Sequence, residues 1–265
     1  MNPVILAVLT VGFIGLIVGL VLAIASALMS VPRDEKAQAL LALLPGANCG
    51  ACGYSGCSGY ANALSKGTAK PGLCSPGGAE TTKAIAAMLG TEPVENQRKT
   101  AVVFCMGGLE HTADKMLYQG ISSCRAAVQL HGGTGKCSYG CMGFGDCKAA
   151  CEYDAVTICN GLARINPALC RACGKCADAC PKGLIRLAPV KQQAVVLCSS
   201  CDKGADTKRA CTAGCIGCMR CVKACPNGAV KVENFKATVD PALCTGCFAC
   251  IAQCKQGCLI KAFAQ

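Results

Sequence analysis

CIGCMRCVKACP (residues 215–226) and CTGCFACIAQC (residues 244–254) both space four cysteines as C-x2-C-x2-C-x3-C. Thiolates in such a run bind a cubane [4Fe–4S] cluster, and the fourth cysteine of each run serves the other cluster of the pair. Gly217 and Gly246 lie where a side chain would hinder backbone N–H groups from turning toward sulfur. The stretch therefore predicts two clusters.

The crossing of the fourth cysteines assigns the ligands of these two clusters. The sets are Cys215, Cys218, Cys221 and Cys254, and Cys244, Cys247, Cys250 and Cys225. The alternative is a pair of structural zinc ribbons. Zinc spacing pairs C-x2-C with a distant partner, so three cysteines at one spacing favour iron.

An upstream stretch carries a second pair of runs, only one of which is regular. CRACGKCADACP (residues 170–181) repeats the spacing above, whereas CSYGCMGFGDCKAAC (residues 137–151) is spaced C-x3-C-x5-C-x3-C. The same crossing rule predicts two more sets of ligands. They are Cys137, Cys141, Cys147 and Cys180, and Cys170, Cys173, Cys176 and Cys151.

Short strands are expected between the runs of each pair. AVTICNGLARI (residues 155–165) places two apolar segments around Asn160–Gly161, a favoured type I′ hairpin turn, and AVKVENFKATVD (residues 229–240) has the same layout. Two hairpin strands backed by short helices form the βαββαβ arrangement of ferredoxins. The predicted fold class is therefore α+β.

An internal repeat precedes the two pairs of runs. AVVFC (residues 101–105) and AVVLC (residues 194–198) lie 93 residues apart, and each reads as a buried strand that ends on a thiol. A cysteine-rich module follows each strand, which indicates a duplicated unit.

Cysteine usage and charge restrict the class of protein. Of 265 residues 27 are cysteines, and their clustered spacing indicates metal in a reducing compartment. The formal net charge is +11, but about five oxidised cubanes with four thiolates each would contribute about ten negative charges. No aromatic residues alternate with the basic ones, so no nucleic-acid partner is expected.

The N-terminal segment is long and apolar. No charged residue occurs from Met1 to Pro32, and the 26 residues Val4–Met29 exceed the length needed to cross a bilayer. Arg33 and Lys36 are the first positive charges, which predicts a single-pass anchor with the bulk of the chain in the cytoplasm. A signal peptide is the alternative, but a basic n-region is missing and export would oxidise the cysteines.

The segment after the anchor contains a fifth four-cysteine pattern. NCGACGYSGC (residues 48–57) and a later cysteine give C-x2-C-x4-C-x16-C, with a helix expected over about residues 59–66. The glycines of the string keep the loop open to thiolates and N–H groups, so one more [4Fe–4S] cluster is predicted, with zinc as the alternative. The ligands are Cys49, Cys52, Cys57 and Cys74.

NCGACGYSGC, after one apolar segment and before ferredoxin-like modules, closely resembles the B subunits of the Rnf complexes along essentially the whole chain. These complexes are ion-pumping ferredoxin:NAD+ oxidoreductases of membranes. The string is shared with a corrinoid protein subunit of acetyl-CoA synthesis, but the anchor and the tandem modules favour the Rnf type.

The resemblance implies an electron-transfer subunit of a translocase in the bacterial cytoplasmic (inner) membrane. Reduced soluble ferredoxin would deliver electrons to this chain, and the other subunits of the complex would pass them to NAD+ while Na+ or H+ crosses the membrane. The alternatives are the polyferredoxin arm of another membrane redox complex, an Rsx-type reducing system or a hydrogenase, and a zinc-stapled membrane adaptor.

Six segments are predicted from these patterns. They are a transmembrane anchor (1–32), a single [4Fe–4S] domain (33–90), a linker with a strand and a helix (91–134), a first two-cluster ferredoxin module (135–190), a repeat strand with its connector (191–210), and a second two-cluster module (211–265).

Seven cysteines remain outside the five predicted sets: Cys105, Cys124, Cys159, Cys198, Cys201, Cys211 and Cys258. A sixth cluster could use Cys105, Cys124 and Cys198 with either Cys201 or Cys211. Buried free thiols are the alternative, because cysteine is among the most buried residue types. Cys159 and Cys258 are expected to be structural.

Signatures of substrate chemistry are missing from the sequence. No G-x-G-x-x-G joins a strand to a helix and no phosphate-binding loop has the required spacing, so neither NAD nor flavin is expected in this chain. His111 and His131 have no second nitrogen ligand nearby in the sequence. The pattern predicts an electron carrier with five [4Fe–4S] clusters, or six.

Overall fold

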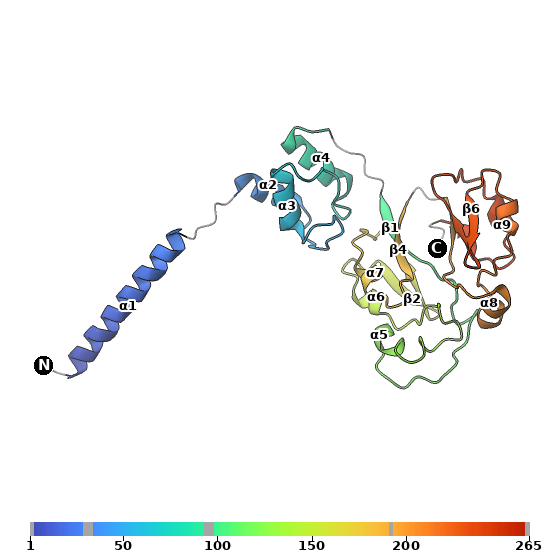
Figure 1. Ribbon diagram of the computed structural model, residues 1–265, viewed down its shortest axis with the longest axis horizontal. Coiled ribbons are helices and arrows are strands. Elements are labelled where there is room, and N and C mark those ends of the chain that lie inside the picture. Colours follow the sequence, from blue (N-terminus) through green and yellow to red (C-terminus); the bar gives the residue numbers. More distant parts are fainter. Residues whose placement is uncertain (1–2, 29–33, 93–97, 191–192, 263–265) are drawn as a thin grey trace.

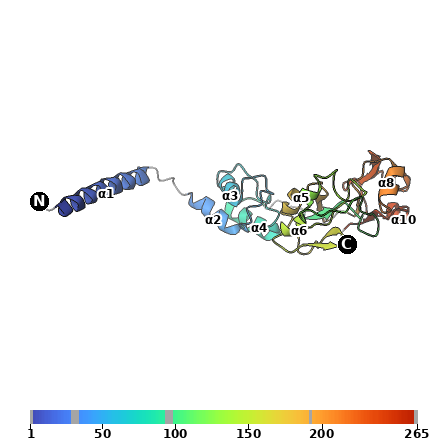
Figure 2. The same ribbon diagram turned by 90° about the horizontal axis from the view of Figure 1, so that it is seen from below.

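The computed structural model describes residues 3–28, 34–92, 98–190 and 193–262. Three parts follow one another along its long axis: the helix α1, a helical unit, and a larger part with four two-stranded sheets (Figures 1 and 2). The predicted charge at Arg33 and residues 93–97 of the predicted linker segment (91–134) lie outside the described residues.

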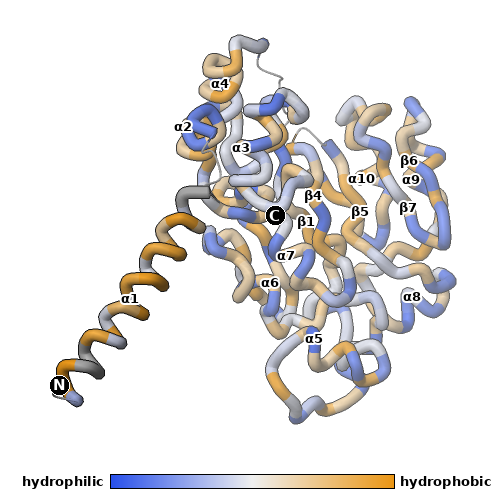
Figure 3. Tube along the Cα trace, turned by 60° about the vertical axis from the view of Figure 1, so that its left-hand side comes forward, coloured by the Kyte–Doolittle hydropathy of each residue, from blue (hydrophilic) through white to orange (hydrophobic). Residues whose placement is uncertain are grey.

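Helix α1 (Pro3–Leu28) carries no charged residue. Its segment Pro3–Ser26 is long and apolar enough to cross a membrane, and it packs against no other part of the described chain. Figure 3 shows mostly hydrophobic residues along α1, whereas the other elements mix polar and apolar residues. The apolar helix expected from the sequence is therefore present.

The helical unit consists of α2 (Glu35–Leu43), α3 (Cys57–Ser65) and α4 (Gly78–Leu89). Its core contains Leu40, Tyr60, Leu64 and Ile85, each at most 1% exposed. Asp34 begins α2 by accepting a hydrogen bond from the backbone N–H of Ala37 at 3.1 Å, as is usual for an N-cap. Helix α3 covers most of the helix predicted over residues 59–66.

The first half of the larger part is built from β1 (Lys99–Val103), β2 (Val156–Cys159), β3 (Leu162–Ile165) and β4 (Ile185–Pro189). Strands β2 and β3 form an antiparallel hairpin, and β1 pairs antiparallel with β4. The turn residues Asn160 and Gly161 have φ values of 49° and 69°, which confirms the predicted hairpin. Three one-turn helices belong to this half: α5 (Cys124–Ala127), α6 (Asp146–Ala149) and α7 (Lys175–Asp178).

The second half repeats this order. Strands β6 (Val230–Glu233) and β7 (Lys236–Val239) form a hairpin, and β5 (Ala194–Val196) pairs with β8 (Leu259–Lys261). Its helices are α8 (Gly204–Ala210), α9 (Arg220–Lys223) and α10 (Ala249–Ala252). The strands ending near Cys105 and Cys198, β1 and β5, therefore pair with the last strand of their own half. The sequence analysis had assigned them to the separate segments 91–134 and 191–210.

The two halves share a buried apolar contact between their outer sheets. Val102 and Ala188 of the first half pack with Val195 and Leu197 of the second. The hydroxyl of Ser199 also donates to the carbonyl oxygen of Phe104 at 2.9 Å. These contacts fix the ends of β1 and β5 beside one another.

A glycine substitution tests the close approach of each hairpin to the run before it. Gly217 has φ +64°, and a Cβ there would lie 2.8 Å from the carbonyl oxygen of Phe235; Gly228 has φ +62° with no described atom within 4 Å. Both Gly→Ala changes cost about 1–2 kcal/mol for the left-handed backbone, but Gly217→Ala adds about 1–3 kcal/mol of overpacking. Anaerobic scanning calorimetry should find the lower midpoint of thermal unfolding in Gly217→Ala; equal midpoints would contradict the packing.

Candidate metal centres

The four runs share one backbone turn. In each, a residue with a left-handed backbone precedes a four-residue helix (α6, α7, α9 or α10) whose second residue is the third cysteine of the run. The left-handed residues are Gly145, Gly174, Met219 and Phe248, with φ of 89°, 86°, 59° and 59°. Because such a backbone is unfavourable for Met and Phe, it marks a site where local strain is maintained by the surroundings.

This turn aligns the irregular run with the regular ones. Cys141 corresponds to Cys215, because the backbone N–H groups of Ala163 and Ala237, at equivalent places in the two hairpins, are directed at these sulfurs. The position that corresponds to Cys218 is then occupied by Phe144. Cys137 lies upstream of the aligned run, so the spacing C-x3-C-x5-C-x3-C does not describe one binding loop.

Cys124 lies where the missing thiol of the irregular run is needed. A narrow cavity is lined by the four cysteines Cys124, Cys141, Cys147 and Cys180. Cys137, which the sequence analysis placed in this set, lines a different cavity.

Asp146 holds Cys124 against the run. Its carboxylate accepts hydrogen bonds from the backbone N–H groups of Cys124 and Arg125, at 2.9 and 3.0 Å, and from the Ser123 hydroxyl at 2.9 Å. Burial opposes ionisation of Asp146, but these donors outweigh it and lower the pKa of the carboxyl. The Tyr118 ring packs on Phe144 with 5.4 Å between ring centroids, which anchors the same loop.

The regular run of the first half also forms a four-thiol site. One narrow cavity is lined by Cys151, Cys170, Cys173 and Cys176, the set that the crossing rule predicts. The sulfur of Cys170 accepts backbone N–H groups of Ala101 and Ala172, both at 3.4 Å.

In the second half, a cavity of about 250 Å³ lies at the predicted cluster ligands Cys215, Cys218, Cys221 and Cys254. The cysteines that line it are Cys215, Cys218, Cys221, Cys254 and Cys258. The sulfur of Cys258 lies 3.8 Å from that of Cys254, and hydrogen bonding with Cys258 lowers the pKa of Cys254 to about 5. In the other predicted ligand set of this half, which contains Cys250, burial raises the pKa of Cys250, and the neighbouring Cys225 and Cys244 raise it further.

The helical unit gathers the four cysteines of its own pattern. Burial raises the pKa of Cys74, and the neighbouring Cys57, Cys49 and Cys52 raise it further. The Asn48 side chain accepts the backbone N–H of Cys57 at 2.8 Å, so it closes the loop at the start of α3.

In the first half, burial opposes ionisation of the third cysteine of each run in the absence of a metal. It raises the pKa values of Cys147 and Cys176 to about 12, with a further increase from the neighbouring cysteines. A bound cation reverses this effect and releases protons on binding. Among the residues that the structure describes, no three His, Cys, Asp or Glu side chains stand close enough to share a single metal ion. Sites made only of thiols, with N–H groups directed at sulfur, fit iron–sulfur clusters.

The remaining cysteines divide into two groups. Cys159 and Cys201 are exposed, and Cys258 is buried beside the set of Cys215. Cys105, Cys198 and Cys211, three of the candidates for a sixth site, line one cavity, but their fourth neighbour is Cys137 instead of Cys124.

Three family models match the chain. They are a putative Fe-S cluster model over residues 44–76, a 4Fe-4S binding domain over residues 163–186 and a 4Fe-4S dicluster domain over residues 214–258. These matches confirm 4Fe-4S binding domains in both halves of the larger part.

Curated relatives cover most of the chain. The B subunit of the Na(+)-translocating ferredoxin:NAD(+) oxidoreductase complex of Acetobacterium woodii is 41% identical over 91% of this chain and 72% of its own length. The B subunit of an ion-translocating oxidoreductase complex of Methanosarcina acetivorans is 39% identical over 86% of both chains. The B subunit of the proton-translocating ferredoxin:NAD(+) oxidoreductase complex of Clostridium ljungdahlii is 38% identical over 92% of this chain and 86% of its own.

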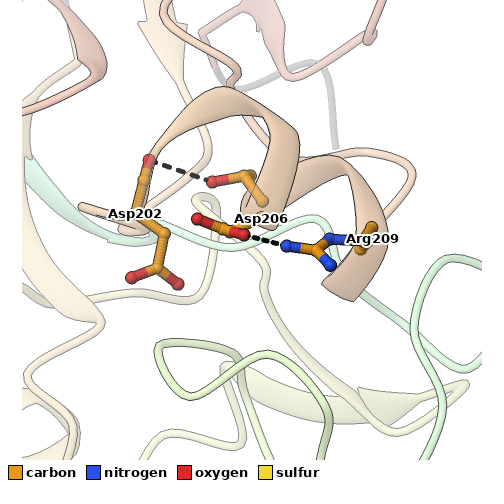
Figure 4. Close-up of polar contacts among 4 residues, drawn as sticks. Asp202, Asp206 and Arg209 are labelled. Atoms are coloured by element: carbon orange, nitrogen blue, oxygen red, sulfur yellow. Dashed lines mark hydrogen bonds and ion pairs between the residues drawn. The ribbon is translucent and has the colours of Figure 1, made fainter.

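Removing the Asp146 carboxylate should release Cys124. Hydrogen bonds to a charged group contribute about 1.5–3 kcal/mol each, so Asp146→Ala should raise the alkylation rate of Cys124 in the metal-free chain about tenfold or more. Mass spectrometry of the labelled peptides gives the rate. Asp206→Ala is the control, because its ion pair with Arg209 on α8 is exposed (Figure 4) and such pairs contribute about 0–1 kcal/mol. Unchanged labelling of Cys124 in Asp146→Ala would contradict the role of this carboxylate.

Proposed function

Because the chain belongs to the family of B subunits of ion-translocating ferredoxin:NAD+ oxidoreductase complexes, we propose that it is an electron-transfer subunit of such a membrane complex. Reduced ferredoxin delivers electrons to it, and the other subunits carry them on to NAD+ while Na+ or H+ is translocated. The observation that supports this most directly is that thiols far apart in the sequence meet in four-cysteine cavities.

Five [4Fe–4S] clusters are proposed, with ligands taken from the geometry. Four sets are those predicted from spacing, and in the fifth Cys124 replaces Cys137. The sets are Cys49, Cys52, Cys57 and Cys74; Cys124, Cys141, Cys147 and Cys180; Cys151, Cys170, Cys173 and Cys176; Cys215, Cys218, Cys221 and Cys254; and Cys225, Cys244, Cys247 and Cys250.

Each cluster supplies one-electron redox chemistry, and the chain controls it through burial and hydrogen bonds to sulfur. Neighbouring sites lie close enough to affect one another. Burial raises the pKa of Cys176 to about 12, and Cys147 of the adjacent set contributes. Cys49 of the helical unit likewise adds to the raised pKa of Cys173, whose main cause is burial. The helical unit thus continues the path from the first half toward the anchor.

The exposed Cys218 and Cys247 support entry of electrons at the second half, the part of the described chain farthest from α1 (Figure 2). Helix α1 would anchor the chain in the cytoplasmic membrane with the bulk of the chain in the cytoplasm. Gly15 and Gly19 have no described atom within 4 Å of an added Cβ, so a helix of another subunit could pack closely on this face.

A rescue experiment tests the Cys124 assignment. Cys124→Ala should lower the iron content by about four atoms per chain, the content of one cubane. Adding Phe144→Cys restores the regular spacing and should restore the lost iron. The same Phe144→Cys change should not rescue Cys137→Ala. Full iron in Cys124→Ala, or rescue of both variants, would refute the assignment.

Electron transfer is tested in the assembled complex. Cys244→Ala removes a proposed ligand and should abolish NAD+ reduction driven by reduced ferredoxin. Cys159→Ala is the matched control, because Cys159 is an exposed cysteine of the β2–β3 hairpin, and its variant should keep full activity. Full ferredoxin-driven activity in an iron-depleted Cys244→Ala complex would exclude this role for the chain.

A further inference from the structure

Four thiols outside the proposed sets meet between the two halves. Cys105 follows β1, Cys198 follows β5, Cys211 follows α8, and Cys137 precedes the irregular run; all four line one narrow cavity. The cavity measures about 20 Å³, compared with about 10 Å³ at the regular set of Cys170. Its volume therefore lies within the range of about 10 to 250 Å³ found at sets with regular ligand spacing.

The four thiols are related by the internal duplication. CSYGC (residues 137–141) and CTAGC (residues 211–215) have the same pattern and lead into equivalent runs. Cys137 thus corresponds to Cys211, as Cys105 at the end of AVVFC corresponds to Cys198 at the end of AVVLC. Each half contributes the same two thiols, so the cavity lies where equivalent surfaces meet.

Backbone N–H groups point at these sulfurs in an equivalent way. Cys105 accepts the N–H of Gly107 at 3.3 Å and that of Cys141 at 3.5 Å. Cys198 accepts N–H groups of Ser200 and Cys215, which occupy the corresponding positions. Paired N–H donors stabilise a metal-bound thiolate, whereas a buried free thiol acts as a small apolar side chain that needs none.

A buried polar network holds the loop of Cys198 and Cys211. The carbonyl oxygen of Thr207 accepts the N–H of Cys211 at 2.8 Å. The Thr207 hydroxyl lies 3.0 Å from that of Ser200 and donates to the carbonyl oxygen of Asp202 at 3.2 Å. Thr207 and Ser200 are 1% and 2% exposed, so their hydroxyls are stable there only because they are bonded. These hydrogen bonds hold the loop of Cys198 and Cys211 in one conformation, as is expected for a rigid metal site.

We propose that Cys105, Cys137, Cys198 and Cys211 hold a sixth [4Fe–4S] cluster at the junction of the two halves. This site rests on the proposed electron-transfer function and extends it. Its ligands accept N–H groups of Cys141 and Cys215, each a ligand of the nearest set in its own half. The sixth cluster therefore joins the two halves into one path, taking one electron from one side and passing it to the other.

The test counts clusters in the full-length chain, purified anaerobically in detergent. The wild type should contain about 24 iron and 24 sulfide atoms, and Cys137→Ser/Cys211→Ser about 20 of each. Cys159→Ser/Cys201→Ser, which changes two exposed cysteines, should keep about 24. About 20 iron atoms in the wild type, or no loss in Cys137→Ser/Cys211→Ser, would overturn the sixth site.

Native mass spectrometry of the wild type decides the matter even if the double variant fails to fold, because six and five clusters give different masses. Failure of the sixth site alone leaves about 20 iron and sulfide atoms and a dithionite-reducible protein. Failure of the proposed function would show as zinc in place of iron and sulfide.

Discussion

Burial of ionisable thiols is the constraint on which this structure depends. A buried thiol resists ionisation, and the pKa values of Cys105, Cys147 and Cys176 rise to about 12. The cores of both halves nevertheless contain several cysteines among their aliphatic side chains. Such cores are small, so the positive charge and the bonds of a metal centre have to supply much of the stability.

The same backbone turn occurs in all four cysteine runs and buries a thiol in each. A left-handed residue followed by one helical turn brings the third cysteine of each run to a buried position, and the hairpin after each first run directs an N–H group at its first cysteine. The irregular run keeps this turn but has Phe144 in place of the second cysteine. The Phe144 ring contacts Tyr118, and Asp146 binds the loop that carries Cys124. In the proposed assignment, Cys124 from a distant loop takes the position of the missing second cysteine.

The duplication also explains the junction of the two halves. Strands β1 and β5 place their apolar residues in one buried cluster, so the thiols that follow these strands lie beside one another. Each half contributes two thiols to the cavity at their interface, so the four-cysteine site needs both halves. Three of the seven cysteines left unassigned by the sequence, Cys105, Cys198 and Cys211, lie together there.

Short sequence patterns predict the turns, strands and helices that depend on neighbouring residues. The Asn160–Gly161 turn, the strand ending near Cys105 and the apolar helix α1 all follow from short-range preferences, and the regular runs reveal their third cysteines directly. The pairing of β1 with β4 and the position of Cys124 depend on contacts between distant segments. The signal available for Cys124 was indirect: aligning the runs at Cys147 shows Phe144 where a cysteine is expected. Spacing alone instead assigned Cys137, the nearest cysteine upstream.

The most direct test of the account is to locate the iron. Anomalous diffraction at the iron absorption edge, from crystals of the chain grown without oxygen, should show a separate peak at each four-cysteine set, including one beside Cys124 and Cys147. Peaks at the zinc edge in the same places, or an iron peak bound by Cys137 with Cys141 and Cys147, would contradict it.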